Sequence, residues 1–332
     1  MAAIRRRFPD AHLTYLVEPQ AAAVVRHNPH INALMIAERP GGLRRLAYDL
    51  GLAWRLRAEH FDLVIDFHGG PRSAWLTWAT GAPQRIGYDV PGRGWIYTTR
   101  APWTRALVPP RHSVQNQWDL LAPLGIDAAD RARDPVVIAE DPAAVGSVAA
   151  RLDAAGVPAD APLIVMHVSA GNPFRRWPAD RFAAVAAALA REDHARRIII
   201  SSGPSEADAA NRIAADAQRE AGVAATAIVR CGEFDLAELR ALVGRAALYI
   251  GGDSGPLHIA SGTRTPIVAL FGPTLPERSM PWRDETIPAI AVDAGPVPCR
   301  PCHQRHCVPG DFRCLTMITT EQVIEAARRL LR

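Results

Sequence analysis

YIGGDSGPLHIASGTRTPIVALFGPT, residues 249–274, is the stretch of sequence that decides the fold. An apolar run ends in two glycines, a turn follows, a helix is predicted to begin near Ser254, and a second apolar run leads to FGPT. Small residues at such a turn let backbone N–H groups approach an anion at the start of the helix. We expect Asp253 to cap this helix and His258 to lie one turn into it; the structural alternatives are a plain cap and a buried core histidine. Because ligands of open α/β sheets bind at the carboxyl ends of strands, the stretch predicts a site as well as a fold.

The same alternation of short apolar runs and helical stretches continues on both sides of that segment. Several runs are apolar at almost every position, as expected for parallel strands that are buried on both faces. Strands are predicted at 12–18, 33–37, 62–68, 162–169, 197–203, 247–253 and 266–272, and helices at 43–59, 179–192, 205–220 and 235–245. This alternation predicts βαβ units, doubly wound sheets and an α/β fold class.

The predicted units form two groups on either side of residues 141–162, which read as a helix followed by a Pro/Ala linker. A chain of 332 residues has the length of two domains. Thr319 and Gln322 stand at capping-box spacing and open an amphipathic terminal helix. We therefore expect two doubly wound domains, at 1–145 and 146–332.

The N-terminal group begins unusually. Residues 1–18 read as the end of a helix, a turn and a strand. A doubly wound domain normally starts with a strand whose following loop meets the ligand. We therefore expect the first sheet to lack its central strand, either because the fold starts unusually or because the true start lies upstream.

Composition excludes several classes of protein. Hydrophobic residues make up 48% of the chain and charged residues 22%, which is ordinary for a globular protein and excludes wholesale disorder. No apolar run reaches the roughly 18–20 residues of a membrane span, and the N-terminus lacks the apolar core of a signal peptide. The sequence therefore predicts a cytoplasmic location.

Arginine supplies all of the basic charge of Lys and Arg side chains in this chain. Lys+Arg is 38 against 34 for Asp+Glu, a net charge of +4, and no lysine is present. Biased codon usage explains this composition, and attraction to phosphates or to an anionic membrane surface is the functional alternative. Because the arginines are scattered among acids, we expect no nucleic-acid partner.

Two further loops that follow predicted strands carry candidate ligands. The first, MHVSAGNPFRRWPADRF at 166–182, places Arg175 and Arg176 just before a helix, where a guanidinium fork suits a diphosphate. The second, SSGPSEADAANR at 201–212, places Glu206 where a carboxylate can accept hydrogen bonds from a ribose. The structural alternatives are solvated loop charges and a first-turn acid that compensates the helix dipole.

A compact cysteine cluster lies near the C-terminus. It consists of four cysteines that are separated by two, four and six intervening residues: Cys299, Cys302, Cys307 and Cys314. In a reducing compartment such spacing favours a structural metal, zinc or another thiolate-bound ion, over disulfides. Reduced pairs and redox-formed disulfides are the alternatives. The segment is too short for a core of its own, and Cys231, which stands apart, is expected to be a buried apolar residue.

The three loops together resemble the donor half of glycosyltransferase family 9, the heptosyltransferase family of lipopolysaccharide core assembly. The family signature Asp-(Ser/Thr)-Gly-x-x-His stands at 253–258, and Phe-Gly-Pro-Thr stands at 271–274. The His-x-(Ser/Gly)-Ala element stands at 167–170, and Lys/Arg-x-Trp-Pro stands at 175–178, with Arg175 in place of the usual lysine.

The resemblance extends to the first domain. The family's Asp-Leu-Gln-Gly-x-x-(Lys/Arg)-Ser stands at 66–73 as DFHGGPRS, with Phe67 and His68 in place of Leu and Gln, and its Arg-Ile-Gly-(Phe/Tyr) stands at 85–88. This makes Asp66, His68 and Arg72 the acceptor-side candidates. The family's Gly-Asp-Val/Ile-Leu loop, with the presumed catalytic aspartate, would lie upstream of the first residue, so the catalytic residue is unassigned.

The resemblance implies a GT-B-like architecture of two Rossmann-like domains that face a cleft. It implies transfer of a sugar, heptose, from an ADP-heptose-like donor to a lipid A/core-type lipopolysaccharide acceptor, at the inner face of the inner membrane and without a required cofactor. The donor residues implied are Ser169, Ala170, Arg175, Glu206, Asp253, Ser254, Gly255 and His258. The alternatives are another sugar-nucleotide enzyme of this architecture, such as an epimerase, and a sugar-nucleotide-binding protein without catalysis.

Overall fold

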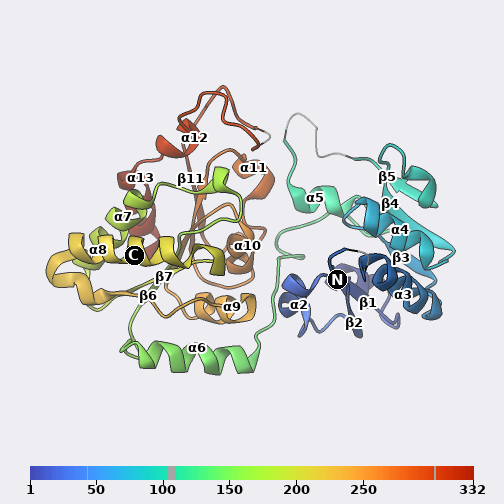
Figure 1. Cartoon of the computed structure of the whole chain (residues 1–332), viewed down its shortest axis with the longest axis horizontal. Helices are drawn as coiled ribbons and strands as arrows, with labels where there is room; N and C mark the ends of the chain where they lie inside the picture. Colours follow the sequence, from blue (N-terminus) through green and yellow to red (C-terminus); the bar gives the residue numbers. More distant parts are fainter. Residues whose placement is uncertain (43, 104–109, 303) are drawn as a thin grey trace. The chain divides into compact units, whose positions relative to one another are not determined.

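The computed structural model describes residues 1–42, 44–103, 110–302 and 304–332, and it divides the chain into two compact units (Figure 1). The N-terminal unit comprises Met1–Ala22 and Pro29–Asp134, and the C-terminal unit comprises Ala23–Asn28 and Pro135–Arg332. The predicted boundary at residue 145 falls inside helix α6 (Pro142–Ala154), which belongs to the C-terminal unit.

The described part of the C-terminal unit contains one sheet of six parallel strands in the order β8-β7-β6-β9-β10-β11. The strands are β6 (Leu163–His167), β7 (Arg197–Ser201), β8 (Ile228–Val229), β9 (Leu248–Gly252), β10 (Ile267–Phe271) and β11 (Ala289–Asp293). Counted from β6, the order is the 3-2-1-4-5-6 of doubly wound nucleotide-binding sheets. The winding reverses between β6 and β9, and ligands of such sheets bind outside the strand ends at this point.

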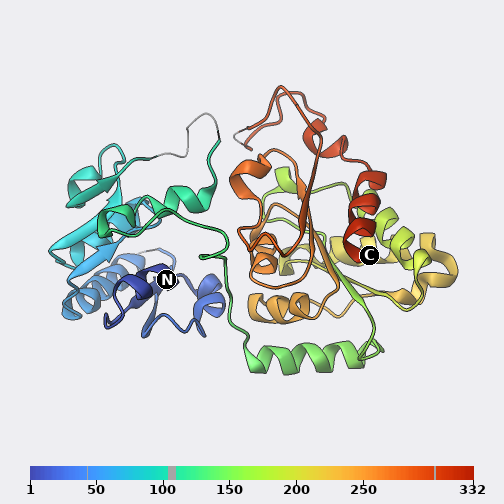
Figure 2. The ribbon, with the colours of Figure 1, turned by 180° about the vertical axis from the view of Figure 1, so that it is seen from behind.

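Helices cover both faces of this sheet (Figure 2). One face packs against α7 (Ala179–Glu192), α8 (Ala207–Ala221) and α13 (Thr320–Leu331), and the other against α6, α9 (Leu236–Gly244) and α10 (Gly255–Ser261). Every residue of β6, β9 and β10 is buried, which explains why their sequences are apolar almost throughout. Alanines on the inner face of α7 let the helix backbone lie close to the strands.

The described strands of the N-terminal unit form two separate parallel sheets, β1-β2 and β3-β4-β5. The strands are β1 (Thr14–Val17), β2 (Ala33–Ile36), β3 (Leu63–Ile65), β4 (Gln84–Tyr88) and β5 (Thr99–Ala101). Both β1 and β3 have a single hydrogen-bonded neighbour among the described residues, so both are edge strands. The residues of β1, β2 and β3 are only half-buried, in contrast to the C-terminal sheet.

The remaining elements are short or belong to the N-terminal part of the chain. The helices there are α1 (Ala2–Arg7), α2 (Pro19–Val25), α3 (Arg44–Ala58), α4 (Pro71–Ala79) and α5 (Ser113–Trp118), and α11 (Pro276–Ser279) and α12 (Arg313–Thr316) lie near the C-terminus. Short 3₁₀ turns are η1 (Gly94–Ile96), η3 (Ala122–Leu124), η4 (Pro173–Arg175), η5 (Pro204–Glu206) and η6 (Gly222–Ala227).

All seven predicted strands and all four predicted helices are present, with ends shifted by a few residues. The predicted capping box also forms, because the Thr319 side chain accepts the Gln322 backbone N–H and the Gln322 side chain accepts the Thr319 N–H. Strands β4, β5, β8 and β11 were not predicted. β4 reads QRIGY, with polar residues and a glycine, and β8 is two residues long, so neither gives a clear apolar run.

Candidate functional site

The loops after β6 and β9 meet where the winding of the C-terminal sheet reverses. Nη1 of Arg175 lies 3.1 Å from Oδ2 of Asp253 and also donates a hydrogen bond of 3.1 Å to the Asp253 carbonyl. The Asp253 side chain is 3% exposed, whereas the Arg175 side chain is 31% exposed. The structure therefore brings together the two residues that the sequence predicted to share a site, and it leaves one side of the guanidinium open to solvent.

A glycine allows these loops to approach each other. A Cβ added at Gly252 would lie 3.1 Å from the carbonyl oxygen of Arg175, which is tighter than ordinary van der Waals contact. A larger residue at the end of β9 would therefore push the arginine loop away. Glycine at this position serves close backbone approach, as expected where a loop lies across the end of a strand.

The predicted capping role of Asp253 is wrong. Ser254 is the N-cap residue of α10, it makes no side-chain capping bond, and its hydroxyl donates to the Gly252 carbonyl at 3.3 Å. The Asp253 carboxylate faces the Arg175 guanidinium instead, because a buried carboxylate is stabilised more by a cation than by a single amide. At Gly255 an added Cβ would meet nothing within 4 Å, so the surface beside this residue is open.

His258 lies at the edge of the same cluster and is not a buried core histidine. Its Nε2 is 3.8 Å from Oδ1 of Asp253, and its side chain is 48% exposed. The pKa of His258 is lowered because its surroundings desolvate the imidazolium, an effect that the nearby Asp253 carboxylate opposes and that Arg175 reinforces. The imidazole can therefore contact a ligand in its neutral form.

Arg176 turns away from Arg175 and pairs with an acid. Its guanidinium forms an ion pair with Glu206, whose side chain is 10% exposed, and its Nε donates to the Ala170 carbonyl at 2.8 Å. The structure thus connects the predicted loop at 166–182 to the predicted loop at 201–212. One oxygen of Glu206 is engaged within the protein, and Ala170 takes part through its backbone.

Ser169 is buried and links strand ends. Its hydroxyl accepts the Gly203 N–H at 2.9 Å and lies 3.0 Å from Nε2 of His167, whose Nδ1 lies 3.1 Å from the Ser201 hydroxyl. Burial lowers the pKa of His167 to about 4, so this imidazole is neutral. Ser169 and His167 therefore hold the ends of β6 and β7 together beneath the site.

Sequence reasoning missed Gln304, which completes the cluster. Its Oε1 accepts a hydrogen bond of 2.6 Å from Nε of Arg175 and one of 3.0 Å from the Asn172 side chain. Its Nε2 donates to the Thr274 hydroxyl at 3.4 Å. Gln304 is thereby hydrogen-bonded to both the arginine loop and the FGPT loop. No local pattern signals this role; the available hint is that Gln304 lies within the cysteine-rich segment 299–314.

The acceptor-side candidates gather after β3 in the N-terminal unit. Oδ1 of Asp66 accepts the N–H groups of His68 and Gly69 at 2.9 and 3.0 Å. Oδ2 accepts the hydroxyls of Ser73 and Tyr97 at 2.9 and 2.7 Å. Burial and this bond to Asp66 raise the pKa of Tyr97. Asp66 accepts four hydrogen bonds and is 5% exposed, so its role is to fix the conformation of the loop after β3.

His68 and Arg72 differ in their freedom. His68 is exposed, and its Nδ1 accepts the Gly70 N–H at 3.1 Å, which leaves Nε2 directed away from that bond. Arg72 is held by Asp49, which accepts from its Nε and Nη2 at 3.1 and 2.6 Å, and by the Glu38 carbonyl at 2.6 Å. Of these two, His68 is the side chain that this geometry leaves available to a ligand.

Comparison with known proteins decides the family. The model of glycosyltransferase family 9 (heptosyltransferase) matches residues 50–311. The chain belongs to glycosyltransferase family 9. It is therefore a glycosyltransferase, and this family membership does not favour the epimerase alternative.

Relatives of this family 9 chain extend over its whole length. A lipopolysaccharide heptosyltransferase 3 of Escherichia coli is 29% identical over 342 residues, covering 100% of this chain and 94% of the relative. A solved family 9 glycosyltransferase from Veillonella parvula DSM 2008 has a TM-score of 0.80 at 24% identity, covering 99% of this chain and 91% of that chain. The solved ADP-heptose lps heptosyltransferase II of E. coli has a TM-score of 0.76 at 18% identity, covering 99% and 92%. These structures confirm the predicted α/β, GT-B-like fold class.

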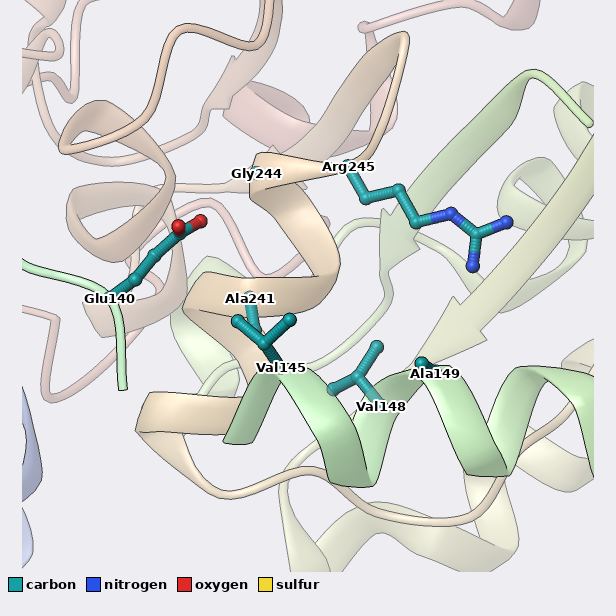
Figure 3. A pocket seen from close by; sticks show the side chains of 7 residues that line it. All are labelled: Glu140, Val145, Val148, Ala149, Ala241, Gly244 and Arg245. Carbon is teal, nitrogen blue, oxygen red and sulfur yellow. The ribbon is translucent and has the colours of Figure 1, made fainter. Parts of the chain in front are cut away.

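Two hollows of this family 9 protein lie outside the donor cluster. A hollow of about 230 Å³ between α6 and α9 is lined mainly by Val145, Val148, Ala149 and Ala241 (Figure 3). It contains none of the predicted site residues. A second hollow, of about 320 Å³, is lined by Pro19, Gln20, Glu38, Arg39 and Pro40, which follow the carboxyl ends of β1 and β2. Its position at strand ends, beside the carbonyl that holds Arg72, makes it the better candidate for ligand contact.

The cysteines of segment 299–314 are free thiols close enough to influence one another. The pKa of Cys314 is raised to about 11, first by burial and then by the charges of Cys299, Cys302 and Cys307. In the part of the chain that the structure describes, no three His, Cys, Asp or Glu side chains are arranged to hold a metal ion. Cys231 is half-buried, and burial raises its pKa, so it is an unreactive thiol.

No helix within the described ranges combines the length and the apolar character needed to cross a bilayer.

Proposed function

We propose that this chain transfers heptose from an ADP-heptose-like donor to a sugar of a lipopolysaccharide acceptor. The names of its relatives support this proposal, since they include lipopolysaccharide heptosyltransferase 3 and ADP-heptose lps heptosyltransferase II. The observation that carries it is the arrangement of Arg175 and Asp253 at the reversal point of the C-terminal sheet. Sheets of this order bind nucleotides at that point.

The donor diphosphate would bind at the open side of Arg175. Nε and Nη1 are engaged by Gln304 and Asp253, and among the described residues no acceptor contacts Nη2. Two N–H groups of a fixed guanidinium therefore remain for phosphate oxygens. As the bond between sugar and diphosphate breaks, negative charge grows on the diphosphate. A cation already in place stabilises this charge without reorganising, and we propose that no cofactor is needed for this step.

The other predicted donor residues would act around this arginine. We propose that Ser254, Gly255 and His258 contact the phosphate or sugar from the exposed surface of α10. Glu206 would use its second carboxylate oxygen toward the ribose. Ser169 and Ala170 would act indirectly, because one is buried with His167 and the other presents its carbonyl to Arg176.

The acceptor would bind in the N-terminal unit, beside the loop after β3. A carboxylate of this unit would remove the proton of the acceptor hydroxyl as it attacks the sugar. Asp66 positions the loop, because both its oxygens already accept hydrogen bonds. We propose that His68 contacts the acceptor sugar through Nε2. The protein would work in the cytoplasm, at the inner face of the inner membrane, where such an acceptor is exposed.

We also propose that the four cysteines of segment 299–314 bind a structural metal, zinc or another thiolate-bound ion. Their spacing supports it, and Cys299, Cys302 and Cys307 lie near enough to Cys314 to raise its pKa. Binding would draw the sulfurs toward one point and deprotonate them. Metal analysis of the purified chain, before and after thiol-specific modification, tests this. A metal-free protein whose thermal stability is unchanged by added zinc would exclude it.

The test of the main proposal is transfer itself. The full chain is incubated with ADP-heptose and with lipopolysaccharide that lacks its outer heptose, and ADP release and the mass of the acceptor are measured. We expect one heptose to be added and one ADP to be released. Binding of ADP-heptose without transfer to any heptose-deficient acceptor would support the non-catalytic alternative, and release of free sugar without acceptor would support the epimerase alternative.

A further inference from the structure

Helix α3, which Figure 1 labels among the elements of the N-terminal unit, carries an apolar stripe on its solvent-exposed side. Leu46, Leu50 and Trp54 are 64%, 54% and 73% exposed. They stand four residues apart, so they lie one above the other on the helix surface. Side chains of this size normally avoid water, and a contiguous apolar stripe of this kind marks an interaction surface.

This stripe is additional to the face by which α3 packs on the N-terminal unit. Leu52 and Leu56 are 0% and 4% exposed and form a small core with Leu76 of α4 and with Ala37. One apolar face of α3 is therefore already buried within the N-terminal unit. The exposed stripe contributes nothing to that core, and folding alone does not account for it.

The charges around the stripe are basic. Helix α3 contains four arginines and a single acid, Asp49. Arg45 lies 3.8 Å from Asp49, whereas Arg44, Arg55 and Arg57 are exposed and have no acidic partner among the described residues. Leucine and tryptophan on one side with arginines beside them are the composition of a helix that lies in the interface of an anionic bilayer.

Hydrogen bonds connect helix α3, which carries the stripe, to the loop after β3 that holds Asp66 and His68, here called the acceptor loop. Asp49, on the same helix, accepts two hydrogen bonds from Arg72, at 3.1 and 2.6 Å. Arg72 lies in the first turn of α4, directly after the loop that Asp66 holds and that presents His68. A surface in contact with α3 is therefore held at a fixed distance from this loop.

We propose that the stripe of Leu46, Leu50 and Trp54 docks α3 onto an anionic lipid bilayer and so presents the acceptor loop to the membrane surface. The apolar side chains enter the interfacial region, and the unpaired arginines contact the lipid phosphates. This inference rests on the proposed function, because a lipid-linked acceptor is what gives the docking its use.

The experiment is cosedimentation of the full chain with phosphatidylcholine vesicles that contain or lack phosphatidylglycerol. The variant L46S/L50S/W54S removes the stripe. The matched control, V137S/V223S/V308S, removes three other exposed apolar side chains, which are 70%, 95% and 84% exposed. We expect the parent and the control to bind anionic vesicles alike, and the stripe variant to bind roughly tenfold to a hundredfold more weakly. A third variant, R44Q/R55Q/R57Q, should lose the preference for phosphatidylglycerol.

Equal vesicle binding by the stripe variant and the parent would overturn the proposal. So would a parent that sediments as a dimer without vesicles and a stripe variant that is monomeric, because the stripe would then face a second copy. Matching thermal melting curves confirm that the variants are folded. Transfer to a lipid-free acceptor oligosaccharide separates the two proposals. We expect the stripe variant to keep this activity, whereas a parent that docks on vesicles but transfers no heptose would refute the proposed function and leave the docking intact.

Discussion

Replacing Arg175 by alanine tests where the diphosphate binds. The substitution removes a guanidinium that is fixed by Gln304 at 2.6 Å and by Asp253 at 3.1 Å. It leaves the backbone of the loop unchanged, because the contact at Gly252 involves the Arg175 carbonyl and not its side chain. The expected result is weaker binding of ADP and of ADP-heptose.

The magnitude follows from two effects. A charge-assisted hydrogen bond at a half-buried position contributes roughly 1.5–3 kcal/mol, which is about tenfold to a hundredfold in affinity. In addition, the variant leaves the Asp253 carboxylate, 3% exposed, without its cation and close to the incoming phosphate. The repulsion between these anions adds to the loss. The double variant R175A/D253N should therefore bind ADP more tightly than R175A alone.

Isothermal titration calorimetry with ADP on the full chain measures these affinities. The matched control is Arg329→Ala, which removes an exposed arginine of the terminal helix and hence the same formal charge. The control should bind as the parent does. If Arg175→Ala binds ADP as tightly as the control, the diphosphate does not contact this loop, and the donor site must be withdrawn. If R175A/D253N binds no better than R175A, the electrostatic part of the reasoning is wrong.

Three further predictions follow from the hydrogen-bond networks. The pKa of His167 is about 4 when folded and about 6.5 when unfolded, so the unfolded chain binds more protons between these values. Urea unfolding should therefore show stability falling as pH falls from about 6.5 to 4, by up to about 3 kcal/mol, and His167→Gln should flatten this dependence. Gln304→Ala should weaken ADP binding severalfold in the parent and have little further effect in an Arg175→Ala background, as calorimetry of the double-mutant cycle would show. Asp66→Asn should lower the thermal midpoint, because an NH₂ group cannot accept the hydrogen bond that Tyr97 or the backbone donates, at a cost of about 1–3 kcal/mol; an unchanged midpoint would contradict the role given to Asp66.

The C-terminal sheet could be predicted because the burial of each strand is visible in that strand's own sequence. β6, β9 and β10 are buried on both faces, so each is apolar along almost its whole length, and a loop that contains glycine follows each of them. The strands of the N-terminal unit were harder to predict from the sequence. β4 reads QRIGY, and its first two residues, Gln84 and Arg85, are exposed and half-buried, respectively, so it carries polar residues that a fully buried strand would exclude.

The site could be predicted in outline and not in its contacts. The order of the strands places 169–176 and 253–258 side by side, so Arg175 and Asp253 meet as expected. The pattern around Asp253 also fits a helix cap, and sequence alone does not show that a cation nearby competes for the carboxylate. The partner of Glu206 was similarly hidden, because Arg175 and Arg176 are adjacent and only the loop conformation decides which turns toward it.

Gln304 shows why the remaining contacts escape prediction. It lies 129 residues from Arg175 in sequence and has a left-handed backbone, with φ of 56°, that no local pattern announces. Its segment is held by hydrogen bonds to neighbouring elements, including those from the buried Arg300 to the Thr274 carbonyl of the FGPT loop and to Asp293 at the end of β11. Because Gln304 belongs to this segment and also accepts the hydrogen bond that fixes Arg175, the two are thermodynamically linked. A ligand that favours the bound geometry of Arg175 must also favour the ordered segment, and by the reciprocity of linkage, ordering the cysteines must favour that ligand.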